Sequence, residues 1–261
     1  MAAASDRDSI LSLITNQKDG LVDLWRTVER LDENFRQILQ SVSSDDRLKI
    51  LQTSYKKTGM TILHYAVYKS DTETVEMILD CVSEEERYIL LSAQTKQELA
   101  LIHYACFYDR SRILSLLISV LKNETWYKLL QITSALGFTP LHLSALRGHT
   151  QAISTIADSL TAQQLILLLR IKDDDGYTPL QLAEYHGNQA AANLLQDYQT
   201  KALIDVALQQ ADQTGSNFRH KKIYLRTGTV SISLVLFSLI NLFMGSDYEK
   251  YAEKLRGWTL K

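Results

Sequence analysis

The stretch that decides the fold is GFTPLHLSALRGH, residues 137–149. It holds two histidines, a glycine near each end and Pro140, one of only two prolines in the chain. The same pattern recurs every 39 residues, as TILHYAV around His64, ALIHYAC around His103, TPLHLSA around His142 and TPLQLAE around Gln181. Four segments in one register indicate a chain built from internal repeats.

Each repeat is predicted to fold as a turn followed by two antiparallel helices. Gly137 lies in the turn, where a left-handed backbone is favoured. Thr139 is a candidate N-cap, and Pro140 suits the first helical position because its missing N–H would have no partner there. The fourth repeat has the same Thr-Pro pair at residues 178–179. The second helix of the third repeat is expected at TQAISTIADSL, residues 150–160.

These residues resemble the ankyrin repeat, whose motif is Gly-x-Thr-Pro-Leu-His-x-Ala followed by Gly-His and an apolar second helix. Residues 137–149 and 176–188 match this motif nearly throughout, with Gln181 for the histidine in the second segment. Residues 98–110 match least, since they lack the Gly, Thr and Pro. The resemblance covers residues 43–211 and implies an all-α ankyrin-repeat solenoid that binds proteins, without indicating which ones.

A third short helix is predicted in every repeat. Ankyrin repeats usually run to about 33 residues, and the extra residues here follow their own pattern. Ser44, Ser83 and Thr161 stand at the predicted N-caps of these helices. The segments that align at the same spacing are SSDDRLKILQ (43–52), VSEEERYILL (82–91), KNETWYKLLQ (122–131), LTAQQLILLL (160–169) and QTKALIDVAL (199–208).

Helices are also expected at both ends of the array. Residues 1–42 are predicted to form an N-terminal helical cap, with a short helix at 7–16 and an amphipathic helix at 20–41. A coiled-coil dimer seam is the alternative interpretation of this segment. Helix 199–210 is expected to close the fourth repeat, and residues 212–226 have the composition of a polar, basic linker.

Residues 227–246, TGTVSISLVLFSLINLFMGS, carry no charge and are predicted to form a C-terminal apolar helix that spans a membrane. The basic flank at 219–226 favours a cytosolic array, and the short tail at 247–261 is typical of a tail-anchored protein. We therefore expect the array at the cytosolic face of an intracellular membrane. The alternative is a helix or strand pair that packs on the array of a protein of the cytoplasm or nucleus.

Other function classes find little support in the sequence. A net charge of −2 does not favour a nucleic-acid surface, and the two cysteines cannot supply four zinc thiolates. The two cysteines also suggest a reducing compartment, and no secretory signal is evident. No phosphate-binding, metalloprotease or serine-hydrolase motif occurs. We expect no enzyme, cofactor, metal or small-molecule substrate.

The recurrent histidines His64, His103 and His142 are predicted to be structural. Stacked helices lie about 10 Å apart, whereas a zinc ligand lies about 2 Å from the ion. We expect each of these histidines to hydrogen-bond the backbone of a neighbouring repeat, and His149 to serve the structure as well.

Partner binding is expected at two rows of residues that vary between the repeats, one at the turn tips and one on the first helices of the concave face. Tyrosine is favoured at binding hot spots, although these rings could instead fill grooves between repeats. The predicted partner-binding residues are Met60, Tyr68, Lys69, Phe107, Tyr108, Phe138, Leu146, Arg147, Tyr177, Tyr185 and His186.

The sequence thus predicts a non-enzymatic scaffold or adaptor at the cytosolic face of a membrane. A soluble cytosolic or nuclear adaptor or inhibitor is the first alternative. A piece of a larger membrane protein, such as an ankyrin-bearing channel, is the second.

Overall fold

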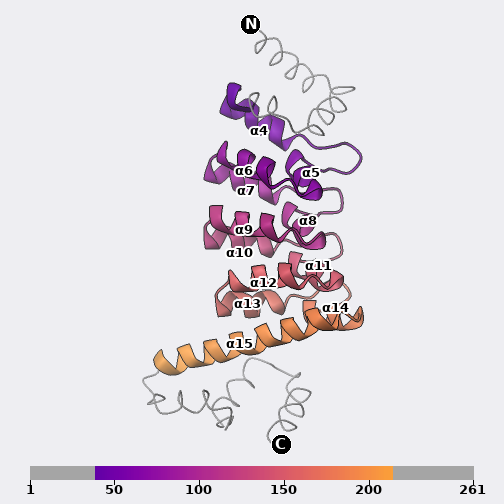
Figure 1. The fold of residues 1–261 in the computed structure, drawn as a ribbon, viewed down its shortest axis with the longest axis vertical. Coiled ribbons are helices and arrows are strands. Elements are labelled where there is room, and N and C mark those ends of the chain that lie inside the picture. Colours follow the sequence, from indigo (N-terminus) through magenta and orange to yellow (C-terminus); the bar gives the residue numbers. More distant parts are fainter. Residues whose placement is uncertain (1–38, 214–261) are drawn as a thin grey trace, which may run out of the picture. The chain divides into compact units, whose positions relative to one another are not determined.

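The computed structural model describes residues 39–213, and the regular elements within this range are helices (Figure 1). The chain divides into two compact units, Met1–Gln196 and Asp197–Lys261, and the repeats described below belong to the first. Two isolated antiparallel bridges, Ser54 with Thr61 and Gln94 with Ala100, close the first two turns.

Each repeat consists of a turn, a first helix, a second helix and a short third helix. The first helices are α5 (Ile62–Lys69), α8 (Leu101–Phe107), α11 (Pro140–Arg147) and α14 (Pro179–Tyr185). The second helices are α6 (Thr72–Asp80), α9 (Ser111–Val120) and α12 (Thr150–Asp158). The third helices are α7 (Glu84–Ser92), α10 (Asn123–Leu130) and α13 (Ala162–Leu169), and α4 (Ser44–Gln52) is the equivalent helix ahead of the first turn.

The helix starts follow the predicted capping residues, with one exception. Thr139 and Thr178 cap α11 and α14, each followed by a proline. Ser83 and Thr161 cap α7 and α13 and close capping boxes with the residue three positions on. The prediction of Ser44 as the cap of α4 is wrong, because the side chain of Ser43 accepts the hydrogen bond from the backbone N–H of Asp46.

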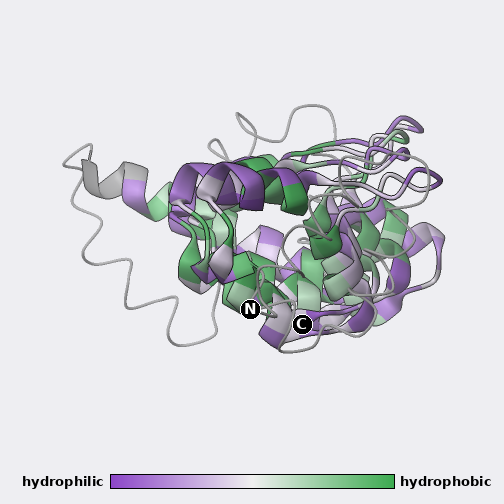
Figure 2. Ribbon diagram, turned by 90° about the horizontal axis from the view of Figure 1, so that it is seen from above, coloured by the Kyte–Doolittle hydropathy of each residue, from purple (hydrophilic) through white to green (hydrophobic). Residues whose placement is uncertain are grey.

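Apolar residues at the same place in each repeat form the core. The first helices lie in one column and the second helices in another (Figure 1), with α8 packed on α5 and α11, and α9 on α6 and α12. Hydrophobic residues gather where the columns face one another (Figure 2). Burying each such side chain contributes about 2 kcal/mol. The aligned buried positions are Leu63, Ile102, Leu141 and Leu180 in the first helices, Val75, Leu114 and Ile153 in the second, and Leu51, Leu90, Leu129 and Leu168 in the third.

Successive turns are joined by single backbone hydrogen bonds. The N–H of Lys96 donates to Thr58 O (2.9 Å) and the N–H of Ala135 to Gln97 O (3.1 Å). The N–H of Asp174 donates in the same way to Leu136 O, at 3.3 Å. The second repeat makes this turn without glycine, because Glu98 itself adopts the left-handed conformation, with φ 58°.

The third helices join each repeat to the next through one donor side chain. Arg47 in α4 donates to Cys81 O at the C-terminal end of α6. Arg87 in α7 donates to Val120 O at the end of α9 (3.3 Å), and Trp126 in α10 donates through Nε1 to Ser159 Oγ at the end of α12 (2.8 Å). All three acceptors lie at helix C-termini. The two arginines bind carbonyls, which lack partners within the helix there, and Trp126 binds the hydroxyl of the C-cap serine. The extra helix therefore fastens consecutive repeats along the edge opposite the turns.

The fourth repeat differs from the prediction at its end. A separate helix at 199–210 is wrong, because α15 runs unbroken from Gln189 to Gln213, past the expected array boundary at 211. Thr200 stands at the position of Thr161, but Leu203 follows it where Thr161 has Gln164. A helix start at Thr200 would therefore gain no reciprocal cap, and the residues around it favour continuing the helix.

Several predicted segments lie wholly or largely outside the described residues. Of the amphipathic helix predicted at 20–41, the structure describes residues 39–41, which are helical, with Leu39 fully buried. The helix at 7–16, the apolar segment 227–246 and the tail 247–261 fall outside, as does the linker 212–226 apart from the last residues of α15. Among residues 39–213, no helix is both long and apolar enough to cross a membrane.

Candidate functional site

The turn-tip residues Phe138 and Tyr177 contribute their backbone to a ladder of histidines. His64 Nε2 lies 3.2 Å from Leu99 O, His103 Nε2 lies 3.0 Å from Phe138 O, and His142 Nε2 lies 3.1 Å from Tyr177 O. Each histidine thus bridges to the turn of the next repeat. The prediction that these side chains bind the backbone of a neighbouring repeat is confirmed.

The other ring nitrogen of each histidine caps its own helix. Nδ1 of His64, His103 and His142 accepts the backbone N–H of the N-cap residue, at 3.3, 3.0 and 3.2 Å. An accepting Nδ1 carries no proton, so Nε2 carries it and donates to the carbonyl. Gln181 keeps only the cap bond, from Thr178 N–H to its Oε1 at 3.0 Å.

Burial holds the histidine ladder in this neutral form. Desolvation lowers the pKa of His64 and of His103 to about 4, and it lowers the pKa of His142 as well. All three side chains are fully buried. At neutral pH the three rings are therefore uncharged, and their hydrogen bonds stabilise the stack.

His149 also joins two repeats. Its Nδ1 lies 3.1 Å from Cys106 O, at the end of the preceding first helix. Arg110 and Asn188 stand at the same place in their repeats and donate to Tyr68 O (3.0 Å) and to Leu146 O (2.7 Å). The structural role predicted for His149 is therefore confirmed.

The first-helix row of predicted binding residues gathers into two groups of rings. The first, which we call the aromatic cluster, links α5 and α8: Tyr68 meets Tyr108 edge-on at 5.4 Å, and Tyr108 meets Phe107 at 5.0 Å. Tyr68 is 42% exposed, while Phe107 and Tyr108 are half-buried. The cluster is Tyr65, Tyr68, Tyr104, Phe107 and Tyr108.

Three cations lie against the aromatic cluster. Lys69 Nζ is 5.8 Å from the Tyr68 ring, and the guanidinium carbon of Arg147 is 4.8 Å from the Phe107 ring. Arg110, which the sequence prediction did not include, lies 5.6 Å from the Tyr108 ring. These distances are within the range of cation–π attraction.

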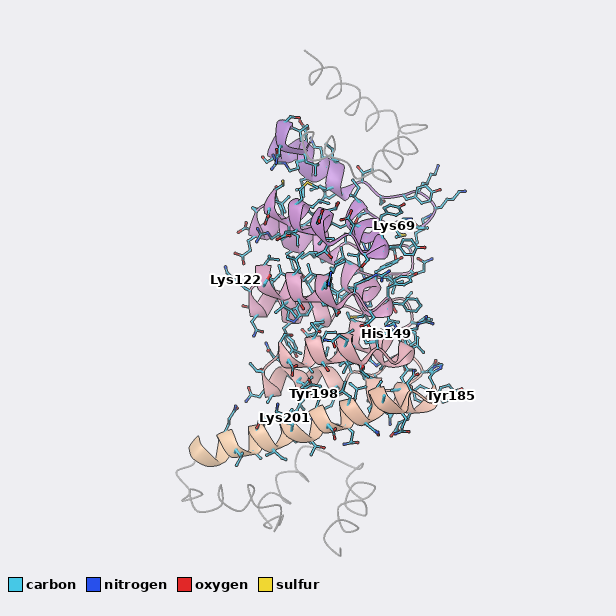
Figure 3. The ribbon with its side chains drawn as sticks, in the orientation of Figure 1. Lys69, Lys122, His149, Tyr185, Tyr198 and Lys201 are labelled. Atoms are coloured by element: carbon cyan, nitrogen blue, oxygen red, sulfur yellow. The ribbon has the colours of Figure 1, made fainter. Side chains whose placement is uncertain are left out.

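The second group of rings belongs to the fourth repeat. Tyr185 lies 5.5 Å from Tyr177 and 5.2 Å from His186. At 70% exposure, Tyr185 is the most exposed of the large hydrophobic side chains described. Figure 3 shows Tyr185, Lys69 and His149 on one side of the repeats and Lys122 on the other.

The remaining predicted residues join neither group. Met60 and Leu146 are half-buried, and Phe138 lies 6.1 Å from the ring of His142 in its own repeat. Sequence reasoning missed Tyr65 and Tyr104, although the repeated string HYA, residues 64–66 and 103–105, was a usable signal.

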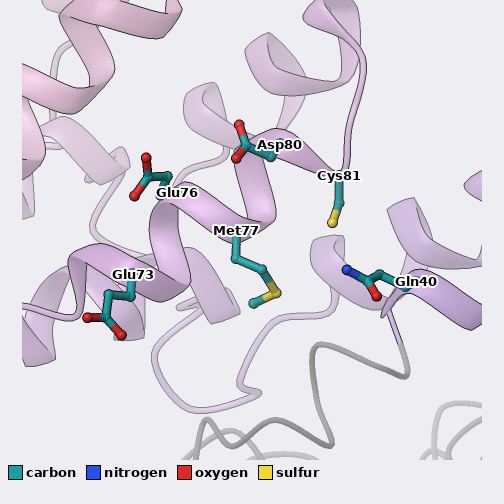
Figure 4. A pocket seen from close by; sticks show the side chains of 6 residues that line it. All are labelled: Gln40, Glu73, Glu76, Met77, Asp80 and Cys81. Carbon is teal, nitrogen blue, oxygen red and sulfur yellow. The ribbon is translucent and has the colours of Figure 1, made fainter.

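A hollow of about 340 Å³ lies beside α6 and is lined by acidic and sulfur-bearing side chains. The three carboxylates spread along α6 and do not converge on one point (Figure 4). No three histidine, cysteine or acidic side chains within residues 39–213 are arranged to hold a metal ion. The lining residues are Gln40, Glu73, Glu76, Met77, Asp80 and Cys81.

The buried thiol is not poised as a nucleophile. Desolvation raises the pKa of Cys106 to about 12, so its thiolate is scarce at neutral pH. Cys106 lies in α8 beneath the first-helix face, where it acts as a small core residue.

Comparison with known families identifies the repeats. A model of three consecutive ankyrin repeats matches residues 102–207, and a model of the single ankyrin repeat matches residues 58–84. The single-repeat match ends where α7 begins. No curated protein matches the chain. Ankyrin repeats are in general protein-interaction modules, and residues 58–84 and 102–207 of this chain are ankyrin repeats.

Proposed function

We propose that the chain is a non-enzymatic scaffold that binds another protein on the face formed by its first helices and turn tips. The observation that carries this proposal is the exposure of two tyrosine rings, Tyr185 (70%) and Tyr68 (42%), at the ends of first helices. A tyrosine presents a large apolar area with few rotatable bonds, so it loses little entropy on binding.

In the proposal, some rings of this face pack against other repeats and others bind the partner. Phe107 and Tyr108 are half-buried and contact other rings, so they stabilise the contact between repeats. Among the described residues, the rings next to Tyr185 are those of Tyr177 and His186 in its own repeat, and most of its surface is exposed to solvent. In the proposal Tyr68 and Tyr185 are therefore the anchors, and the half-buried rings support them.

Proximity labelling from the full-length protein in its own cells tests this role. We expect Tyr68→Ala with Tyr185→Ala to remove a defined set of labelled neighbours while the fold is retained. Tyr88→Ala with Ile89→Ala is the matched control, because these side chains are as exposed as Tyr68, at 41% and 43%, on third helix α7. A large loss of thermal stability with unchanged labelling would instead assign the two tyrosines to packing.

We further propose that residues 227–246 hold this scaffold at the cytosolic face of a membrane. The support is the sequence alone: the segment is uncharged and follows a basic stretch. Expression of residues 1–226 beside the full chain tests it, with carbonate-washed membranes as the readout. We expect only the full chain to stay with the membranes, and equal release of both would favour the soluble adaptor.

A further inference from the structure

The three cations on the aromatic cluster have no acidic partner among residues 39–213. Ion pairs in this range include those of Lys49, Lys122 and Lys128, which lie on or beside the third helices. Lys69 and Arg147 are exposed and Arg110 is half-buried. The first-helix face therefore keeps positive charge that the described chain does not neutralise.

The nearest carboxylates along the chain are engaged elsewhere or turned inward. Asp71, two residues after Lys69, accepts hydrogen bonds from Thr74 N (3.0 Å) and Thr74 Oγ1 (2.7 Å), which cap α6. Asp109 has a buried Oδ1 and raises the pKa of the Cys106 thiol beneath the face, after the larger effect of desolvation. Three cations against one inward-facing carboxylate leave this face positive.

The rings beneath the cations prepare them to bind an anion. A guanidinium that lies against an aromatic face is held in place, so less rotamer freedom is lost when its N–H groups pair with a carboxylate. Arg147 rests on Phe107 in this way, and Lys69 is 5.3 Å from the Tyr65 ring. Carboxylates are recognised by such charge-assisted hydrogen bonds.

The opposite end of the face has different chemistry. At the fourth repeat Asp174 and Asp175 are exposed at the tip beside Lys172, and α14 ends with exposed Glu184 and Tyr185, followed by its C-cap His186. At the first repeat the exposed tip residues are Lys56 and Lys57. The cations that lie against rings are therefore confined to the first three repeats, and the fourth repeat adds two carboxylates at its tip, so a bound chain would have a defined direction.

We propose that Lys69, Arg110 and Arg147, with the aromatic cluster beneath them, bind an acidic, extended segment of the partner protein. This inference rests on the proposed function and names the chemistry of the partner. The cations come from successive repeats, which stack about 10 Å apart. A chain in the extended polyproline II conformation advances about 3.1 Å per residue with three residues per turn, so every third side chain faces the same way. The segment would thus carry an acidic residue at every third position, with apolar side chains between them against Tyr68.

Fluorescence anisotropy of the full chain with labelled synthetic peptides tests the charge and its spacing. The probe peptide has glutamate at every third position and leucine or phenylalanine between, and the comparison peptide has the same composition with its glutamates grouped at one end. We expect the spaced peptide to bind about tenfold more tightly, since only it can reach all three cations. Equal affinity of the two peptides, or no binding of either, overturns the proposal.

Paired variants assign the binding to this face. Lys69→Gln with Arg147→Gln is expected to raise the Kd of the spaced peptide by about tenfold to a hundredfold, because two charge-assisted contacts are lost. Arg112→Gln with Lys128→Gln removes the same charge from α9 and α10, and we expect a change of less than about threefold from this control. An equal loss in both pairs would mean that net charge alone attracts the peptide, which overturns the proposal.

Two further results distinguish this inference from binding of another anion and from the proposed scaffold function. If vesicles of phosphatidylcholine and phosphatidylserine, or a single-stranded oligonucleotide, lose binding in Lys69→Gln with Arg147→Gln while the peptide does not, the face binds another anion and the inference fails. If that pair leaves proximity labelling intact while Tyr68→Ala with Tyr185→Ala abolishes it, the proposed scaffold function stands and the acidic segment is wrong.

Discussion

The turn edge and the third-helix edge both join each repeat to the next, but they do so with different side chains. Along the turn edge, His64, His103 and His142 each cap a helix with one nitrogen and reach the next turn with the other. Along the third-helix edge, the bridging residues are Arg47, Arg87 and Trp126. One edge repeats a single residue type in a fixed register, and the other uses unlike residues.

Burial accounts for this difference. The ladder histidines are fully buried, so both ring nitrogens must find partners, and few side chains supply an acceptor and a donor at that spacing. Arg47 and Arg87 are half-buried, and water can satisfy the donors that protein groups do not. Trp126 is fully buried, but it has a single donor, which Ser159 Oγ accepts. The turn edge therefore tolerates few residues, while the third-helix edge accepts any long donor that reaches a helix C-terminus.

Acidification should have the largest effect on stability, through the histidines of the turn edge. The folded pKa of His64 and of His103 is about 4, below the ordinary value of 6.5, so the unfolded chain takes up protons first as pH falls. The stability that the neutral histidines contribute is fully present above about pH 6.5. It is lost toward pH 4, by about 1.4 kcal/mol per pH unit for each histidine. Urea denaturation followed by circular dichroism between these values measures the slope. A flat profile would contradict the neutral ladder.

Removal of one ladder histidine is the next largest effect expected. His103→Ala deletes the bridge to Phe138 O, leaves Ala100 N–H without its acceptor and opens a cavity, which together cost about 4 kcal/mol. His103→Gln should recover part of this loss, since Gln181 shows that glutamine keeps the cap. The same urea experiment at pH 7 compares the two variants, and equal losses would show that the cap contributes little.

Sequence reasoning reached the turn edge because the edge obeys one register. The spacing of GFTPLHLSALRGH and its copies predicted the turns, the caps at Thr139 and Thr178 and the backbone role of the histidines. A buried side chain that must satisfy two hydrogen-bonding partners is the same residue in three of the four repeats. Its constant spacing is visible in the sequence, so its role could be predicted. The cap of α4 was misread because Ser43 and Ser44 are adjacent and either could have capped the helix.

The third-helix edge and the binding face could be predicted only in part. The third helices themselves were expected, but Arg87 lies 40 residues after Arg47, and Trp126 is a different residue, so their shared role leaves no pattern. The aromatic row was read as one ladder, yet its third member, Leu146, has no ring, and the rings gather on either side of it. Arg110 was missed because its position holds Asp71, His149 and Asn188 in the other repeats.

A change at Arg87 measures the third-helix edge directly. Arg87 Nε donates to Leu79 O (2.8 Å) and its Nη1 to Val120 O (3.3 Å), so Arg87→Met removes two charge-assisted bonds and keeps the apolar stem. We expect a loss of about 2 kcal/mol, smaller than for His103→Ala because water can reach the freed carbonyls. Arg112→Met on α9 is the control. A loss as large as that of His103→Ala would remove the contrast between the edges.

Substitutions at two turn glycines distinguish the effect of contact between successive turns from the effect of backbone strain. Gly137 and Gly176 both have positive φ, 72° and 85°, so alanine strains the backbone at either site by about 1 kcal/mol. A Cβ at Gly137 would lie 2.7 Å from the backbone N of Asp174, whereas a Cβ at Gly176 would meet nothing within 4 Å. We expect Gly137→Ala to lower the free energy of unfolding by about 1 kcal/mol more than Gly176→Ala. Equal effects would mean that successive turns separate at little cost.

The smallest expected effect lies at an ion pair on the third-helix edge, between Lys122 Nζ and Glu84 at 2.9 Å. This pair also links two repeats. Its removal therefore tests whether an exposed ion pair stabilises the edge as the donors to helix C-termini do. Lys122 has 74% of its side chain exposed, and both side chains must lose rotamer freedom to meet. Lys122→Gln should therefore lower the free energy of unfolding by less than any change described above, and added salt should erase the difference. A loss that approaches that of Arg87→Met would show that the third-helix edge depends on its charges, and the distinction between donors at helix ends and exposed ion pairs would not hold.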